Sequence, residues 1–388
     1  MTRFSCIPSD IRSFLAFLRP HFRYNHHLTF LWLTFTIMLN QRKGTVKNLS
    51  GITQNKSYDS FTRFLKAKYL QPRLLLKLTA LKRLETLKDK AKHLHIVVDV
   101  TWVSKSGKHI WTSIGKSSKK ERVEGIQLLV FCFEVSGQRI PFDFFIINNR
   151  KYGTRLCVND QTMENLSQLE LPRWVETVTL VADAAFAAKK VIHKLKEWGW
   201  NYVFRLPKTW KFENGESVKA FVNGLSRKDF KSGWYMTSHG KRRYCKYYLH
   251  RTELNDVGTV TLIYSYVGSN TDPNKRRIVV TNRALSHTEV LALYQRRWCI
   301  ELLFKELKSE MGLGQMQLSS SLEQQFTAIA VTMIAYNTLF AIYDEPRMAA
   351  GKLKEEFHTR CMRQNLLSFV SKHLPEPVID KFLEKFAV

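Results

Sequence analysis

The sequence lacks the features that mark several classes of protein. Its six cysteines are scattered, with no C-x-x-C pair and no cysteine and histidine cluster at zinc spacing, which argues against a disulfide framework or a structural zinc site. Serine or cysteine nucleophile motifs and phosphate-cradling glycine loops are absent, as are internal repeats and low-complexity segments. No signal peptide is apparent. We therefore expect an intracellular protein with reduced, mostly buried cysteines.

Acidic residues are also scarce: 33 Asp and Glu stand against 61 Lys and Arg, giving a net charge of +28. The basic residues gather in short runs, such as 116–122, 241–243 and 275–277. Such a charge favours a polyanion as partner, with nucleic acid first and an acidic membrane surface second.

Long apolar runs are few. Residues 28–39 are too short to span a bilayer, and residues 326–343 barely reach the minimum length while carrying polar side chains. We expect both to be buried helices, and no membrane as partner.

The spacing of apolar residues divides the chain into five segments. We predict a helical domain (1–90), a first part of a sheet (91–206), a β-rich insertion (207–285), a second part that contains a long helix (286–343) and a helical tail (344–388). The first sheet segment has expected strands at 94–103, 125–135, 139–147, 178–183 and 201–206, with a helix at 186–198. This order predicts an α/β fold with a mixed sheet covered by helices.

Two short stretches of the N-terminal segment, 45–52 and 57–70, are spaced like a helix-turn-helix. Its second helix would present Tyr58, Ser60 and Arg63 outward, where Tyr58 and Arg63 would contact DNA. Many small helical domains show the same punctuation, so a purely structural helical domain is the alternative.

A carboxylate in the stretch YQRRWCIELLFKELKSEMGL shares a narrow stripe with three other side chains. At about 100° per residue, Glu301 falls on the same face as Tyr294, Arg297 and Lys308. Apolar residues border this stripe on both sides, which favours a pocket or groove over a solvated face. The simpler alternative is that Glu301 pairs with Arg297 and Lys305 at helical spacing.

We predict a single helix for this stretch. It would begin at Ser286, where Ser-His-Thr-Glu forms a capping box, and end at Gly312.

Two aspartates lie at or near the ends of apolar strands: Asp99 in IVVDVTW and Asp183 in LVADAAF. Each alone is explained by a buried hydrogen bond, or for Asp183 by capping of the next helix. Together with Glu301 they would repel one another unless divalent cations neutralise them. Three hard oxygen ligands suit two Mg²⁺ ions, with Mn²⁺ as a substitute, about 4 Å apart and acting in phosphoryl transfer. In a basic protein this predicts DNA strand cleavage or joining.

The spacing Tyr294-x2-Arg297-x3-Glu301-x6-Lys308 resembles the Y-R-E-K signature of the DDE transposases of bacterial insertion sequences, in the insertion-sequence-four group. Asp99, followed by Thr101-Trp102, resembles the first catalytic aspartate of that family, and Asp183 the second. The resemblance spans roughly residues 94–343. The gap of 118 residues between Asp183 and Glu301 also fits, because members insert a β-rich domain there.

The resemblance implies an RNase H-like core and cut-and-paste transposition through a DNA hairpin. Asp99, Asp183 and Glu301 would be the catalytic metal ligands. Tyr294, Arg297 and Lys308 would contact phosphates, while Trp298, Trp210 or Trp234 would stack on a displaced base. For Trp298, buried packing is the favoured alternative, because of its place on the helix wheel.

The same resemblance implies partners and a location. Double-stranded DNA would bind as terminal inverted repeats and as target, held by a homodimer in a synaptic complex in the bacterial cytoplasm at the nucleoid. Two other readings stay open: a domesticated, catalytically silent DNA-binding protein, and a nuclease of the same fold that only hydrolyses DNA.

Overall fold

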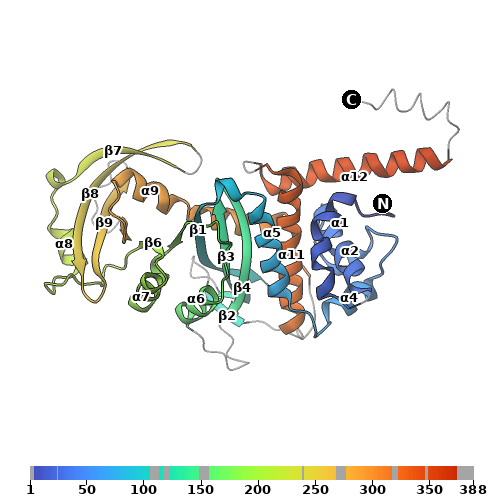
Figure 1. The fold of residues 1–388 in the computed structure, drawn as a ribbon, viewed down its shortest axis with the longest axis horizontal. Helices are drawn as coiled ribbons and strands as arrows, with labels where there is room; N and C mark the ends of the chain where they lie inside the picture. The colour runs from blue at the N-terminus through green and yellow to red at the C-terminus, as the bar shows by residue number, and fades with distance from the viewer. Residues whose placement is uncertain are drawn as a thin grey trace. The chain divides into compact units, whose positions relative to one another are not determined.

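The computed structural model, drawn in Figure 1, describes residues 4–23, 25–104, 113–116, 122–147, 157–237, 240–267, 277–316, 322–345 and 348–373. The chain forms two compact units. Unit 1 comprises Met1–Thr79, Ser104–Thr112 and Lys305–Val388, and unit 2 comprises Ala80–Val103 and Ser113–Phe304. Each unit is described by itself.

Unit 1 is helical, as predicted for the N-terminal segment and the tail. Its helices are α1 (Ser9–Leu15), η1 (Ala16–His21), α2 (His26–Leu39), α3 (Val46–Ser50), α4 (Tyr58–Leu65), most of α5 (Pro72–Glu85), α11 (Leu322–Tyr343) and α12 (Ala350–His373). Helix α2 is apolar on nearly all sides and packs against α11. By length and composition Glu323–Tyr343 could cross a membrane, but 78% of its apolar window is buried in the protein. The expectation of two buried helices is confirmed.

The predicted helix-turn-helix segment contains two short helices, α3 and α4. Ser57 caps α4 by accepting a hydrogen bond from the Ser60 amide at 3.2 Å, and the helix ends at Leu65 rather than near residue 70. Tyr58 is 51% exposed and Arg63 is exposed as well, so both point outward as expected. Their contact with DNA stays a prediction.

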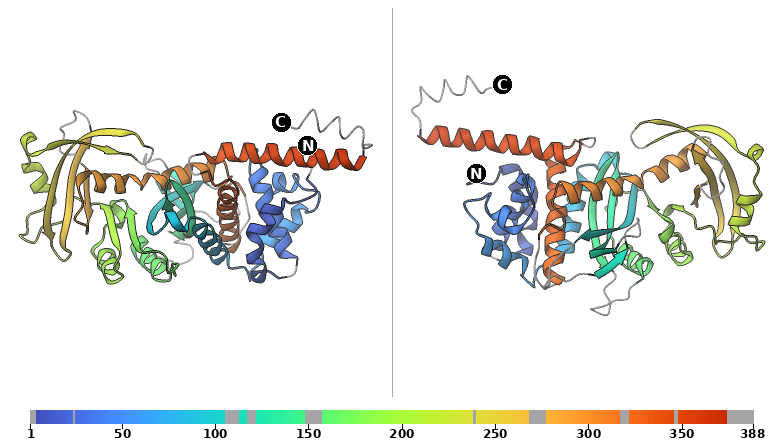
Figure 2. Two further views of the ribbon diagram at one scale, coloured as in Figure 1. Left: turned by 45° about the horizontal axis from the view of Figure 1, so that its top comes forward. Right: turned by 180° about the vertical axis from the view of Figure 1, so that it is seen from behind.

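Unit 2 is built on one sheet, which Figures 1 and 2 show. Within the described residues its ten strands are β1 (His93–Ser104), β2 (Ser113–Lys116), β3 (Arg122–Val135), β4 (Gln138–Ile147), β5 (Thr177–Ala182), β6 (Asn201–Arg205), β7 (Lys231–Met236), β8 (Arg242–Leu254), β9 (Gly258–Val267) and β10 (Arg277–Thr281). They run in the order β2-β3-β1-β5-β6-β10-β9-β8-β7, and β4 pairs with β3. Strands β1, β5 and β6 are parallel, whereas β10 is antiparallel to β6.

Helices cover this sheet, as the α/β prediction requires. They are η2 (Lys88–Lys90), α6 (Val158–Ser167), η4 (Ala184–Phe186), α7 (Lys189–Glu197), α8 (Val218–Gly224), η5 (Arg227–Asp229), α9 (His287–Gln295) and α10 (Trp298–Ser309), whose last residues belong to unit 1. Alternate residues of β1, β5 and β6 enter the main core together with α7. The predicted mixed sheet covered by helices is therefore confirmed.

The predicted insertion does not form a sheet of its own. Strands β7 to β10 continue the sheet from β6, because β10 pairs with β6 on one side and β9 on the other. The division into five domains stays a prediction.

The single helix predicted from Ser286 to Gly312 is wrong in its middle. Its capping box at Ser286 is present, and Gly312, with φ of +71°, ends it while the Leu313 amide donates to Leu307 O at 2.8 Å. Between α9 and α10, however, the amides of residues 296, 297, 299 and 300 donate to carbonyls three residues back. This tighter turn shifts the phase of α10 relative to α9.

The N-terminus of α9 is seated on the strands that follow α8. The His287 ring stacks on Tyr247, with centroids 3.6 Å apart and an interplanar angle of 5°. Gly233 of β7 makes room for it, because a Cβ at that position would lie 2.5 Å from His287 Nε2. The helix also packs on β5, β6 and β10, so it lies over β5, the strand that Asp183 directly follows.

Candidate active site

The two predicted aspartates lie next to each other on parallel strands. The register of β1 with β5 pairs Val98 with Ala182. Asp99 directly follows Val98 in the sequence, and Asp183 directly follows Ala182. Both side chains lie on the sheet face opposite the main core, since Val98 and Ala182 face that core. Asp99 Oδ1 accepts a hydrogen bond from the Val100 amide at 2.7 Å, and Asp183 Oδ1 accepts one from Ala184 at 2.7 Å. Asp183 thus also caps η4, the alternative considered for it alone.

Arg297 joins Glu301 to Asp99. Its Nη1 lies 3.3 Å from Asp99 Oδ2, and its Nη2 donates to Glu301 Oε1. The Arg297 side chain is only 16% exposed, so the pairing takes place in a largely desolvated setting. The simpler reading paired Glu301 with Arg297 and Lys305. Its pair with Arg297 is present, and it also includes an aspartate from β1 in place of Lys305. Two of the predicted carboxylates therefore meet at the guanidinium of Arg297.

Burial raises the pKa of the Asp99 carboxyl from 3.8 to about 6. The charges of Asp183 and Glu301 act in the same direction, whereas the Val100 amide and Arg297 act against them. An ionised Asp99 is therefore held at a cost in stability, which is typical of carboxylates that serve a site rather than the fold.

This cost predicts how the Asp99→Asn variant behaves without metal. Between about pH 4 and pH 6 the folded chain binds a proton at Asp99 that the unfolded chain has lost, so the stability contribution of this group falls as the pH rises through that window. At pH 7.5 the variant should be more stable than the wild type by on the order of 2–3 kcal/mol, and the difference should vanish near pH 4. Urea denaturation in EDTA at several pH values measures it, and equal stability at pH 7.5 would contradict the shift.

Tyr294, at the end of α9, is 8% exposed and shares the field of the same groups. Burial raises the pKa of its hydroxyl; Asp183 acts in the same direction, and Arg297, Arg205 and Arg277 oppose it. The predicted neighbourhood of Tyr294, Arg297 and the carboxylates is thus present in unit 2. Arg205 and Arg277 were not predicted as site residues, because they lie on different strands; Arg277 was noted only as the end of the basic run 275–277.

A second arginine of the turn between the helices is also tied to the sheet. Arg296 Nη1 donates to Oε2 of Glu134 on β3, a carboxylate that is 3% exposed, and Glu134 Oε1 accepts from the Gly137 amide at 2.9 Å. His95 Nδ1 lies 3.6 Å from the same Oε2. Burial and the charge of Arg296 lower the pKa of His95 to about 3, so His95 is neutral and the carboxylate pairs with Arg296. No sequence motif pointed to Glu134.

Two buried cysteines also bring α10 and β3 together. Cys299 lies beside Cys132, and burial raises the pKa of the Cys299 thiol well above its usual value. All six cysteines are free, and four of them are buried, as expected: Cys132, Cys245, Cys299 and Cys361. Since Cys132 and Glu134 lie on one face of β3, α10 rests on that face close to Asp99's strand.

The prediction that Trp298 packs in the interior is wrong, because this side chain is 48% exposed. The tight turn before it changes the helix phase on which that expectation rested. Trp234 is also exposed (49%), while Trp210 packs against the main core. Lys308 lies two turns beyond Glu301 on α10, and burial lowers its pKa. Its contact with phosphate stays a prediction.

The carboxylate oxygens of the site are suitable ligands for a divalent cation, but the three side chains are not arranged around one ion position. Asp99, Asp183 and Glu301 offer the hard oxygens that Mg²⁺ or Mn²⁺ prefers. Among the described residues, however, no group of three or more His, Cys, Asp or Glu is arranged to hold a metal ion. Arg297 instead supplies the positive charge between Asp99 and Glu301.

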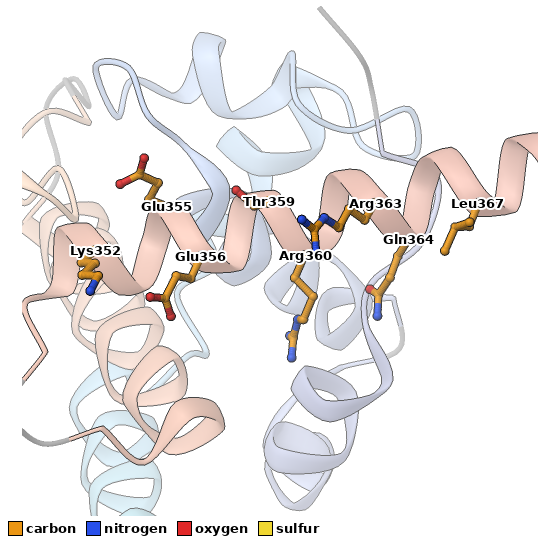
Figure 3. A pocket seen from close by; sticks show the side chains of 8 residues that line it. All are labelled: Lys352, Glu355, Glu356, Thr359, Arg360, Arg363, Gln364 and Leu367. Carbon is orange, nitrogen blue, oxygen red and sulfur yellow. The ribbon is translucent and has the colours of Figure 1, made fainter. Parts of the chain in front are cut away.

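A hollow along α12 of unit 1, shown in Figure 3, contains none of the predicted site residues. Its lining mixes both signs of charge: Lys352, Glu355, Glu356, Thr359, Arg360, Arg363, Gln364 and Leu367. It is therefore not matched to a polyanion.

Among the comparisons with known proteins, a family model spans this site. No curated protein sequence matches the chain. One solved structure with a similar fold is a cryo-EM structure of the piggyBac transposase synaptic complex with hairpin DNA, with 12% identity and a TM-score of 0.48, covering 97% of this chain and 82% of that one. The transposase DDE domain family matches residues 90–338, which include Asp99, Asp183 and Glu301. The chain belongs to the transposase DDE domain family.

Proposed function

We propose that this transposase-family protein excises an insertion sequence and joins it to target DNA by metal-dependent phosphoryl transfer. The observation that carries the proposal is the meeting of Asp99 from β1 and Glu301 from α10 at Arg297, with Asp183 next to Asp99 on the neighbouring strand. A carboxylate set on adjacent parallel strands and a helix is costly to the fold, and the raised pKa of Asp99 reflects this cost. Family membership supports the same reaction class.

Asp99, Asp183 and Glu301 would hold two Mg²⁺ ions, which Mn²⁺ would replace. Bound ions would polarise the scissile phosphate and neutralise charge on the attacking and leaving oxygens. The side chains of the chain itself orient the DNA. Arg297, with a fork of N–H donors, is placed to exchange its carboxylate partners for phosphate oxygens. Tyr294 and, further along the helix, Lys308 would hold neighbouring phosphates.

The proposed reaction has the steps of cut-and-paste transposition through a hairpin. Hydrolysis frees a 3′-hydroxyl at the transposon end, attack on the opposite strand makes a hairpin, and reopening precedes joining to target DNA. The exposed ring of Trp298, adjacent to Arg297, is available to stack on a displaced base. Tyr58 and Arg63 in unit 1 would add contacts to the DNA. A homodimer holding two ends, and a place at the bacterial nucleoid, belong to the same proposal.

The test is cleavage of a duplex that carries the DNA ends flanking this gene, with Mg²⁺, Mn²⁺ or EDTA, resolved on a denaturing gel. We expect a nick and then a hairpin with either metal and intact DNA with EDTA. DNA that is bound but left intact with both metals would replace this proposal by that of a catalytically silent DNA-binding protein. Nicking that never yields a hairpin would indicate a hydrolytic nuclease.

A further inference from the structure

A row of charged side chains crosses the sheet beyond the two aspartates. The register of β5 with β6 pairs Ala182 with Phe204, which places Arg205 opposite Asp183. Asp99, Asp183 and Arg205 are therefore successive members of one row, on the face opposite the main core. On the far side of Arg205 the partner in β10 is Val279.

Arg277 extends this row toward the end of β6. It lies two residues before Val279, so its side chain leaves the same face of β10, on the diagonal from Arg205. Both arginines are exposed. Among the described residues, neither guanidinium has a hydrogen bond or an ion pair to a carboxylate. Arg277 also ends the basic run 275–277, which the proposed function did not use.

The charges of both arginines act on the Tyr294 hydroxyl. Burial raises its pKa, and the charges of Arg297, Arg205 and Arg277 lower it, while Asp183 raises it. The pKa of this hydroxyl therefore depends on the acidic member of the row, Asp183, and on the two basic members, Arg205 and Arg277. A single anionic group held by Arg205 and Arg277 would meet two guanidinium groups that, among the described residues, have no carboxylate partner.

We propose that Arg205 and Arg277 form a subsite for a backbone phosphate of the DNA strand that enters the carboxylate centre. Resting on the proposed function, this inference assigns a direction to the strand: it runs from the carboxylates along the sheet face toward β10. Unpaired arginines on a protein surface are commonly only solvated. Here Arg205 stands in register with Asp183 and Arg277 lies on the diagonal from Arg205. Two forks of N–H donors match the oxygens of one phosphate and would fix its distance from the scissile bond.

The test compares Arg205→Gln, Arg277→Gln and the double variant with a matched control, Arg251→Gln, an exposed arginine of β8. DNA affinity is measured by fluorescence anisotropy over a range of salt, and cleavage by single turnover with Mg²⁺. The double variant should flatten the slope of log K against log salt by about 0.9, the value for one phosphate contact, and each single variant should flatten it by less. Cleavage should slow about ten- to a hundredfold, because the phosphate is no longer held. The control should match the wild type in both.

DNA with one uncharged backbone position at a time identifies which phosphate Arg205 and Arg277 bind. Methylphosphonates are placed one at a time along the strand next to the scissile bond. At one position the substitution should reproduce in the wild type the defect of the double variant and add nothing in the double variant itself, since both remove the same contact. Wild-type slopes and rates in all three variants would overturn the subsite. If the wild type binds DNA but never cleaves it, the proposed function fails, and the salt slopes and the neutral positions still decide on the subsite.

Discussion

Glu301→Gln, Asp99→Asn and Asp183→Asn are each expected to abolish Mg²⁺-dependent cleavage and to leave DNA binding largely intact. Each change removes one anionic oxygen ligand and keeps the shape of the side chain. A loss of at least about a thousandfold in rate, or about 4 kcal/mol of transition-state stabilisation, is the scale for removing a metal ligand from a phosphoryl-transfer site. Binding should be unchanged or slightly tighter, because the variants repel phosphate less.

The measurement pairs single-turnover cleavage with anisotropy on the same labelled duplex, first with Mg²⁺ and then with Mn²⁺. Glu170→Gln, a neutralised exposed carboxylate of the same unit, is the matched control and should cleave at the wild-type rate. Loss of DNA binding by all three site variants would argue against metal ligation. It would show instead that these carboxylates maintain the DNA-binding fold.

Arg296→Met is expected to destabilise the protein by about 3–5 kcal/mol, because it leaves the Glu134 carboxylate buried without a cation. The reverse change, Glu134→Gln, should cost less, about 1–3 kcal/mol, since the Arg296 side chain is 33% exposed and turns to water, while Glu134 is 4% exposed. The double variant should be more stable than Arg296→Met alone. Urea denaturation of the four proteins completes this cycle.

The same variants should loosen α10 locally, and the native cysteines report it. Alkylation by iodoacetamide, read by peptide mass spectrometry, is expected to reach Cys132 and Cys299 sooner in Arg296→Met than in the wild type. The buried Cys245 and Cys361 serve as internal references for general unfolding and should stay protected. A cost below about 1 kcal/mol with all four cysteines protected would mean that the Arg296–Glu134 pair does not hold the helix.

Features set by local signals were predictable from the sequence. The capping box at Ser286 and the stop at Gly312 depend on residues within one turn, and both are present. The strands around Asp99 and Asp183 follow from continuous apolar runs, which predict parallel strands buried on both faces. Parallel strands then bring the two aspartates side by side without further information.

Features set by distant partners were not predictable. The turn between α9 and α10 is fastened through Arg296 to Glu134, 162 residues away in sequence, and no periodicity near either residue indicates this pair. The exposed Trp298 follows from that turn. Arg205 and Arg277 became neighbours of Tyr294 only once the register of β6 and β10 was known. Helix α6 carries polar residues at most positions, and no apolar period marked it.

Because β10 pairs with β6, the insertion cannot be deleted without changing the sheet that carries the site. Deleting residues 207–285 would remove β7 to β10 and leave one side of β6 without partners. Its free N–H and C=O groups would be an open template for another chain, one strand away from Asp183. We therefore expect the truncated protein to aggregate rather than to act as a minimal enzyme. A smaller transposase of this fold would have to keep β10, so that the edge of β6 stays paired.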